Sequence, residues 1–292
     1  MKCTHPIKVK GLTVPCGQCT ACRLNYSAMW ALRCVLESQC HQENVFLTLT
    51  YNDEHLPKNK SVSKREMQNF LKRFRKSVSP AKVRYYLSGE YGSQYSRPHY
   101  HLLVFGIGVK NPVFEKLHWD CKFQGFWCQC KAWKDEKGES IGNCFIGSVT
   151  IASAQYVAKY VMKKRKGTDS KVYYQSLGVD PEFCLLSRRP GLGMSYFDRQ
   201  QKQIYKLGYI MVNGKKFPLP RYYSTKLKER VPEYDFVCEM ESYDKAMKLN
   251  QEWIKLHDKL GYNAYQYLDD QLEQMANNIQ KRMELSKGVL NA

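Results

Sequence analysis

The segment RPHYHLLVFG, residues 97–106, limits the fold of this chain more than any other stretch, because two histidines stand at the head of an apolar strand. Side chains alternate across a β-strand, so His99 and His101 share one face while Tyr100 and Leu102 share the other. The face with the imidazoles must stay open where the strand begins. Two half-exposed histidines with ordinary hydrogen-bond partners would explain the pattern, and so would joint binding of a cation.

A carboxylate on the preceding predicted strand favours the cation. The segment KVRYYLSGEYG, residues 82–92, has the composition of a strand, and a hairpin with the histidine strand would bring Glu90 beside His99 and His101. Two imidazoles and one carboxylate leave coordination positions open for a phosphate substrate, which suits Mg²⁺ or Mn²⁺ and also occurs with iron and zinc. The alternative is a surface glutamate paired with Arg97 or Lys82.

Two tyrosines lie one helical turn apart in a third segment. A strand is predicted at FIGSVTI, residues 145–151, followed by a helix that ends near Arg165 because Gly167 can supply the left-handed terminating residue. On this helix Tyr156 and Tyr160 share one face, beside Lys159 and away from the expected buried stripe. They are either rim residues that cover the core edge or reactive phenols.

These groups together suit one reaction. A tyrosine hydroxyl can attack phosphorus and form an aryl phosphodiester if a cation neutralises the non-bridging oxygens. The product keeps the energy of the phosphodiester, so a free 3′-OH can reverse the step without ATP. The sequence accordingly has no G-x-x-x-x-G-K-[ST] loop. The phenol must lose its proton during the attack, and Lys159 or a metal-polarised water is the candidate base.

The charge of the chain favours a nucleic-acid partner. Lys and Arg number 46 against 27 Asp and Glu, which gives a formal net charge of +19. A helix is predicted for residues 63–78, with Ser63 as its cap and a basic face opposite its apolar one. We expect phosphate contacts, or a merely solvated charged face, from Arg65, Lys72 and Lys76 of this helix and from Lys163, Lys164, Arg188 and Arg189. No spanning segment or signal peptide is evident, so we expect a cytoplasmic protein.

Twelve cysteines in a chain without an evident export signal favour metal binding over disulfides. Thiolates spaced C-x2-C-x2-C, with one more upstream, can converge on a structural Zn²⁺, and an iron–sulfur cluster or free reduced thiols are the alternatives. The residues concerned are Cys3, Cys16, Cys19 and Cys22. A second set is spaced irregularly, and we expect no metal there; it comprises Cys121, Cys128, Cys130 and Cys144.

Three segments in this order resemble a known family: FLTLTY (46–51), RPHYHLLVFG (97–106) and YVAKYVMKK (156–164). They are similar to the motifs of the HUH endonucleases that initiate rolling-circle replication, in the two-tyrosine branch of microvirus-type, gokushovirus-like phages. CGQCTACR and SRRPGLG add to the likeness. Tyr100 is aromatic where the family more commonly has an aliphatic residue, but its side chain is expected to face away from the ligands.

The resemblance, over about residues 16–195, implies an α+β fold with an antiparallel sheet core and flanking helices. It implies that His99, His101 and Glu90 bind the metal and that Tyr156 and Tyr160 are nucleophiles that alternate. The partner would be single-stranded DNA at a replication origin, with a host helicase and polymerase as further candidates. Alternatives are a tyrosine transposase or relaxase of the same superfamily, or a non-catalytic zinc-stapled nucleic-acid-binding protein.

Three parts are expected along the chain: a cysteine-rich segment and helix (1–40), the endonuclease core (41–200), and a basic linker with two antiparallel C-terminal helices (201–292). Within the core, a strand is predicted at 44–51, whereas residues 107–144 and 168–232 show no clear periodicity. The C-terminal helices begin near Glu239 and break at Gly261. They would serve as a packing module or an oligomerisation element.

Overall fold

The structure, a computed structural model, describes residues 1–9, 12–92, 94–160, 164 and 169–290. The chain divides into two compact units, Tyr26–Asp198 and the combination of Met1–Asn25 with Arg199–Ala292. Each unit is considered by itself below. The three-part division expected from the sequence stays a prediction.

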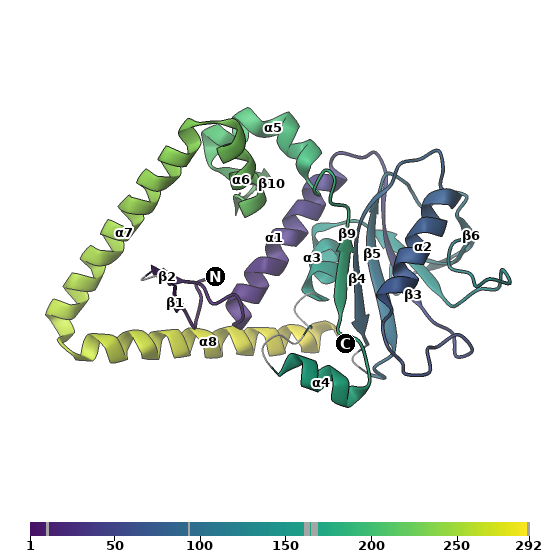
Figure 1. Ribbon diagram of the computed structural model, residues 1–292, viewed down its shortest axis with the longest axis horizontal. Coiled ribbons are helices and arrows are strands. Elements are labelled where there is room, and N and C mark those ends of the chain that lie inside the picture. The colour runs from purple at the N-terminus through teal and green to yellow at the C-terminus, as the bar shows by residue number, and fades with distance from the viewer. Residues whose placement is uncertain (10–11, 93, 161–163, 165–168, 291–292) are drawn as a thin grey trace. The chain divides into compact units, whose positions relative to one another are not determined.

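A seven-stranded antiparallel sheet forms the centre of the unit Tyr26–Asp198, in the order β6-β7-β8-β3-β5-β4-β9 (Figure 1). Its strands are β3 (Asn44–Thr50), β4 (Arg84–Tyr91), β5 (Pro98–Phe105), β6 (Phe114–Asp120), β7 (Gly125–Cys130), β8 (Cys144–Ser148) and β9 (Phe183–Leu186). Helices flank the sheet, and further helices follow toward the C-terminus. The α+β class that the motifs implied is therefore confirmed, as is the hairpin of the two strands at 82–92 and 99–106.

The two faces of the sheet have different roles because side chains alternate along β3 and β5. On one face Leu49 and Leu102 join the main hydrophobic core under helix α2 (Lys64–Ser77). Tyr100 faces the same way, and its hydroxyl accepts a hydrogen bond from the backbone N–H of Ser63 at 2.8 Å. The opposite face of the same strands carries the histidines, away from α2.

Helix α2 forms as its sequence pattern predicts. The Ser63 side chain accepts from the Glu66 backbone N–H at 3.1 Å, which caps the first turn. The Glu66 carboxylate pairs with Arg73 at 2.9 Å and does not return to the cap in the reciprocal arrangement that the pattern suggested. The apolar face is buried in the core through Met67, Phe70, Leu71 and Phe74.

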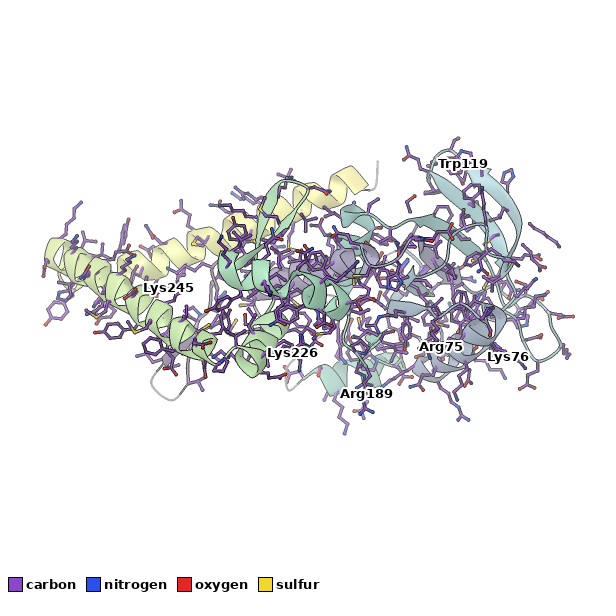
Figure 2. The ribbon with its side chains drawn as sticks, turned by 90° about the horizontal axis from the view of Figure 1, so that it is seen from above. Arg75, Lys76, Trp119, Arg189, Lys226 and Lys245 are labelled. Atoms are coloured by element: carbon purple, nitrogen blue, oxygen red, sulfur yellow. The ribbon has the colours of Figure 1, made fainter. Side chains whose placement is uncertain are left out.

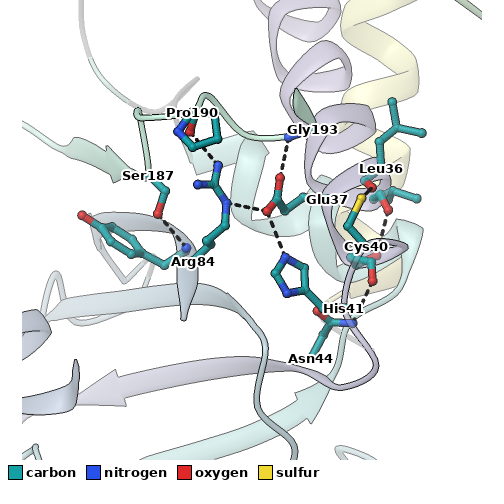
Figure 3. A network of polar contacts seen from close by, with 12 residues as sticks. Leu36, Glu37, Cys40, His41, Asn44, Arg84, Ser187, Pro190 and Gly193 are labelled. Atoms are coloured by element: carbon teal, nitrogen blue, oxygen red, sulfur yellow. Dashed lines mark hydrogen bonds and ion pairs between the residues drawn. The ribbon is translucent and has the colours of Figure 1, made fainter. Parts of the chain in front are cut away.

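A buried carboxylate fastens helix α1 (Thr20–Ser38) to the sheet and to the segment after β9 (Figure 3). Glu37 is fully buried and receives Arg84 Nε at 2.5 Å, His41 Nε2 at 3.0 Å and the Gly193 backbone N–H at 2.6 Å. Arg84 also donates through Nη2 to the Pro190 carbonyl at 2.7 Å. Burial acts to raise the pKa of Glu37, but these donors outweigh it and lower the pKa below its usual value.

Glu37→Gln is expected to destabilise the protein by about 3 kcal/mol at neutral pH, because it leaves the largely buried Arg84 without its counter-charge. The lowered pKa of Glu37 means that its contribution is complete above the unfolded value of about 4.3 and is lost as the pH falls through the folded value. Urea unfolding at a series of pH values measures this difference. The exposed Glu54→Gln should change little, and a Glu37→Gln effect that grows with acidity would contradict the assignment.

Several elements differ from the sequence expectations. Residues 107–144, expected to be irregular, contain the β6–β7 hairpin, and residues 168–232 contain ordered elements. The strand predicted at 145–151 ends at Ser148, because Thr150 caps helix α3 (Ile151–Lys159). That helix ends at Lys159 with Tyr160 as its C-cap, before the predicted end near Arg165. The elements within 168–232 are α4 (Ser170–Leu177), β9, α5 (Met194–Leu207), β10 (Tyr209–Val212), β11 (Lys215–Pro218) and α6 (Arg221–Arg230).

The other unit holds two small hairpins and long helices. Strands β1 (Ile7–Val9) and β2 (Leu12–Val14) pair antiparallel, as do β10 and β11. Helix α7 (Glu233–Leu260) begins a few residues before its predicted start and ends at Gly261, as expected, and α8 (Asn263–Leu290) follows. Across that turn the rings of Trp253 and Tyr265 lie 4.8 Å apart. Within the described ranges, no helix has the length and apolarity needed to cross a membrane.

Candidate active site

The registers of β3, β4 and β5 determine which side chains surround the paired histidines. His101 lies opposite Thr48 of β3 on one side and Ser88 of β4 on the other. His99 lies opposite Glu90. His101 and Glu90 are each only 4% exposed, so this polar group stands inside the fold and not on its surface.

His101 is held through both ring nitrogens. Nδ1 lies 3.0 Å from the Thr48 hydroxyl, and Nε2 lies 3.2 Å from a carboxylate oxygen of Glu90. If Nδ1–H donates to Thr48, the Nε2 lone pair faces the carboxylate, and a cation would relieve that repulsion. If the hydroxyl donates instead, Nε2–H donates to Glu90 directly. Thr48 therefore helps to set which nitrogen presents a lone pair toward Glu90.

Helix α3 brings the two tyrosines to this face of the sheet. Thr150 and Ser153 form a capping box at its start, and Ala154, Val157 and Ala158 are its buried residues. The Ser88 hydroxyl of β4 donates to the Val157 carbonyl at 3.4 Å, which ties the helix to the strand beside β5. The helix thus crosses close to the histidine strand.

Both tyrosine rings contact His101. The Tyr160 ring stacks on the imidazole with centroids 4.7 Å apart and planes 7° apart. The Tyr156 ring meets the same imidazole edge-on at 5.2 Å, and the two tyrosine rings are 4.8 Å apart. Phe46 of β3 lies 6.1 Å from His101 and 6.0 Å from Tyr156 on the same side. The structure therefore gathers the histidine, carboxylate and tyrosine groups that the sequence singled out, in what we call the tyrosine–histidine site: Glu90, His99, His101, Tyr156 and Tyr160.

The two tyrosines differ in access. Tyr156 is 41% exposed, whereas Tyr160 is 8% exposed, contrary to the expectation that both lie at the rim. Burial, reinforced by the Glu90 carboxylate and the Tyr156 hydroxyl, raises the pKa of Tyr160 well above its ordinary value. Burial also raises the pKa of Tyr156, but a hydrogen bond with Tyr160 opposes this increase. Tyr156 is the phenol that an incoming strand can reach.

A close approach of backbone to imidazole fixes His99. A Cβ atom at Gly92 would lie 2.7 Å from Cε1 and 2.9 Å from Nδ1 of His99, so only glycine leaves room for the ring in this position. The Gly92 backbone N–H also bonds to the Arg97 carbonyl at 2.9 Å, which closes the connection between β4 and β5. Neither Gly92 nor Thr48 was given a role from the sequence. Thr48 lies inside FLTLTY, and only the strand register shows what it faces.

The donor set of the trio His99, His101 and Glu90, two nitrogens and a carboxylate, fits a divalent cation. The ring centroids of His99 and His101 are 6.3 Å apart. Among the described residues, two groups bring three or more possible ligand atoms within 4.8 Å of one another, and this trio is neither of them. Ligation by all three would need their side chains to draw together. The two compact groups are Cys3 with Cys16, Cys19 and Cys22, and His55 with Asp135 and Glu139.

The basic residues are spread over separate surfaces. Arg65, Lys72 and Lys76 are exposed on α2, which covers the sheet face opposite the tyrosine–histidine site. Figure 2 shows Lys76 on that helix and Arg189 in the segment after β9. Arg188 and Arg189 are exposed near the Arg84 end of β4, whereas Glu90 is near its other end.

The remaining basic candidates lie around the end of α3. Lys159 is half-buried as the last residue of α3, and Lys164 is exposed. Lys163 lies outside the described residues. Lys159 and Lys164 are therefore the described cations closest along the chain to the two tyrosines.

The two cysteine sets behave differently. The sulfur atoms of Cys3, Cys16, Cys19 and Cys22 come together within 4.8 Å of one another. In the second set Cys121 is exposed, whereas Cys128, Cys130 and Cys144 are buried in the main hydrophobic core. The sulfurs of Cys128 and Cys144 are 3.1 Å apart across β7 and β8.

Comparisons with known proteins agree with this fold and site. A family model of the phage replication-associated protein ORF2 matches residues 44–165, which include the histidine strand and both tyrosines. The replication-associated protein VP4 of Bdellovibrio phage phiMH2K is 31% identical over 289 residues, covering 92% of this chain and 80% of that protein. The replication-associated protein ORF2 of Spiroplasma virus 4 is also 31% identical, over 93% of this chain and 84% of its own length.

A third relative, the replication-associated protein ORF4 of Chlamydia phage 1, is 28% identical over 84% of this chain and 60% of its own length. No solved structure matches the chain. The chain therefore belongs to the family of phage replication-associated proteins of the microvirus type, as the three motifs indicated.

Proposed function

We propose that the protein starts and ends rolling-circle replication by cutting one DNA strand with a tyrosine, which stays joined to the new 5′ end. The observation that supports this most strongly is the contact of both tyrosine rings with His101, itself 3.2 Å from Glu90. The membership in a family of phage replication proteins supports the same role. The site of action would be the replication origin, in the cytoplasm of a bacterial host.

The roles of the residues follow from their positions. Tyr156 Oη attacks the phosphorus atom of the scissile phosphodiester and forms a tyrosyl phosphodiester, while the 3′-oxygen of the neighbouring nucleotide leaves and takes up a proton. The phenol proton passes to solvent or to Lys159, the half-buried residue next to the tyrosine pair. Because the new bond is also a phosphodiester, a 3′-OH can attack it in the reverse sense and rejoin the strand.

His99, His101 and Glu90 would hold Mg²⁺ or Mn²⁺, which when bound neutralises the non-bridging oxygens of the attacked phosphate. Thr48 holds the His101 ring in the orientation that points Nε2 to Glu90. Phe46 packs against the same group and restricts the space around Tyr156. Each residue orients or holds a group that the attack requires.

The difference in burial gives the tyrosines an order. Tyr156 is exposed and makes the first cut at the origin. Tyr160, stacked on His101, becomes reactive when the first tyrosine carries the strand, and it takes part in the second transfer that releases a unit-length genome. The ring contact between Tyr156 and Tyr160 keeps both within reach of the same histidine.

One assay tests the proposal. The protein is incubated with Mn²⁺ and single-stranded oligonucleotides from its own replicon, and the products are separated under denaturing conditions. We expect a protein–DNA adduct and a free 3′-OH fragment, formed only when the divalent ion is present. Tight DNA binding without an adduct at any sequence of the replicon would contradict the proposal and favour a non-catalytic nucleic-acid-binding protein.

Thr48→Val is expected to lower the cleavage rate about 10- to 100-fold and to raise the Mn²⁺ concentration needed for half-maximal rate. The reason is that Val has no hydroxyl for His101 Nδ1, which Thr48 contacts at 3.0 Å. DNA affinity should stay unchanged. Thr48→Ser restores the hydroxyl and should recover most of the rate, and a Ser variant as impaired as the Val variant would show that the hydroxyl does not position His101.

A further inference from the structure

Four sulfur atoms form a compact group in the unit that contains the N-terminus. All of them lie within 4.8 Å of one another, and we call Cys3, Cys16, Cys19 and Cys22 the cysteine cluster. Cys3 comes from the segment before β1, Cys16 and Cys19 follow β2, and Cys22 stands in the first turn of α1. Side chains from three separate stretches therefore meet at one point.

The spacing of the sulfurs fits a single tetrahedral ion. Cys3 Sγ lies 3.6 Å from Cys16 Sγ and 3.7 Å from Cys19 Sγ. Four thiolates around Zn²⁺ at the usual Zn–S length have their sulfurs about 3.8 Å apart, whereas a disulfide would bring two of them to about 2.05 Å. In a four-iron cluster each thiolate binds a different iron, which sets the sulfurs further apart.

Backbone donors point at these sulfurs. The N–H groups of Gln18 and Cys19 reach Cys16 Sγ at 3.4 and 3.2 Å, and the N–H of Cys16 reaches Cys3 Sγ at 3.3 Å. N–H groups directed at sulfur stabilise thiolates, the form that binds metal. The turn that directs two of them contains Gly17 at φ +70°, a conformation that glycine adopts without strain.

The cluster is also reachable. Cys16 and Cys19 line a cavity of about 510 Å³ together with Thr4, His5 and Gln18. An ion can therefore enter without unfolding of the segment. Cys19 directly precedes α1, so an ion bound there would join the β1–β2 hairpin to the start of that helix.

We infer that Cys3, Cys16, Cys19 and Cys22 bind one structural Zn²⁺ that fastens the N-terminal hairpin to the first turn of α1. Binding releases the protons of the thiols and leaves four thiolates on the ion. This site is separate from the tyrosine–histidine site in residues and in metal preference. It does not depend on the strand-cleavage reaction.

The test uses the full chain purified under reducing conditions. Mass spectrometry of its metal content should find about one zinc per chain after dialysis, as expected for one tetrahedral site. Cobalt added to metal-depleted protein should give the intense visible absorption and the sulfur-to-cobalt charge-transfer band of a tetrahedral tetrathiolate complex. Both measurements use the wild-type chain, so they remain decisive even if a cysteine variant fails to fold.

Variants then assign the ligands. Cys16→Ser and Cys19→Ser should lose most of the zinc, while Cys121→Ser, which changes an exposed cysteine outside the cluster, should keep it. His101→Ala should also keep its zinc, even though it is expected to lose cleavage. A reduced chain that retains no metal and shows no tetrahedral cobalt spectrum would overturn the inference, as would stoichiometric iron with inorganic sulfide.

Discussion

Simultaneous replacement of Tyr156 and Tyr160 by phenylalanine should abolish the covalent protein–DNA adduct, a loss of at least about 10⁴-fold in rate. No other phenol in the described residues has a ring contact with His101. Tyr156→Phe alone should remove most of the first cut, because Tyr156 is the exposed member of the pair. Tyr160→Phe should cut once but fail to complete strand transfer. Cleavage of end-labelled oligonucleotides, read under denaturing conditions, measures all three.

Tyr243→Phe is the matched control for these variants, since it changes an exposed tyrosine on α7 by the same single oxygen atom. It should cut and transfer at the wild-type rate. An adduct that persists in the double variant would mean that another residue is the nucleophile. First cleavage that depends on Tyr160 and not on Tyr156 would reverse the order assigned from burial.

The second large effect is expected at His101. His101→Ala should lower cleavage by about 10²- to 10⁴-fold while DNA affinity changes about twofold or less. The substitution removes the ring that contacts Thr48, Glu90 and both tyrosines, yet it leaves the exposed basic residues in place. Rates at saturating oligonucleotide, together with equilibrium binding by fluorescence anisotropy, separate the two quantities.

His118→Ala serves as the control for His101→Ala, because His118 is an exposed histidine on β6. It should leave rate and affinity unchanged. Since His101 is buried, thermal unfolding of the variant must show a folded protein at the assay temperature. Equal losses of cleavage and affinity in a folded variant would argue that His101 binds DNA and has no part in the reaction.

The central strands and α2 could be predicted from sequence because their patterns are local. Alternation of apolar residues marks β3 and β5, and the step of three and four residues marks α2 between Ser63 and Val78. The β6–β7 hairpin was missed because β6 lies at the edge of the sheet and its side chains are mostly exposed, so it lacks the apolar run of a buried strand. Thr150 ended the strand before α3 through a cap that competed with strand propensity.

The candidate site was predictable in its residue types but not in its geometry. The sequence placed His99 and His101 on one face and Tyr156 with Tyr160 on one helical face. Only the packing of α3 against β4 and β5 shows that Tyr160 is buried while Tyr156 is exposed. The basic face of α2 was likewise visible in the sequence, but which side of the sheet it covers is a tertiary property that no local pattern contains.

The most direct test of the account is to identify the residue that carries the DNA. The adduct formed with Mn²⁺ and an origin oligonucleotide is digested with trypsin and nuclease, and the peptide that retains a nucleotide is sequenced by mass spectrometry. The account predicts a phosphotyrosyl bond on Tyr156 in the wild type, and on Tyr160 once a second transfer has occurred. A nucleotide on any residue outside this pair, or cleavage that leaves no nucleotide attached to the protein, would contradict it.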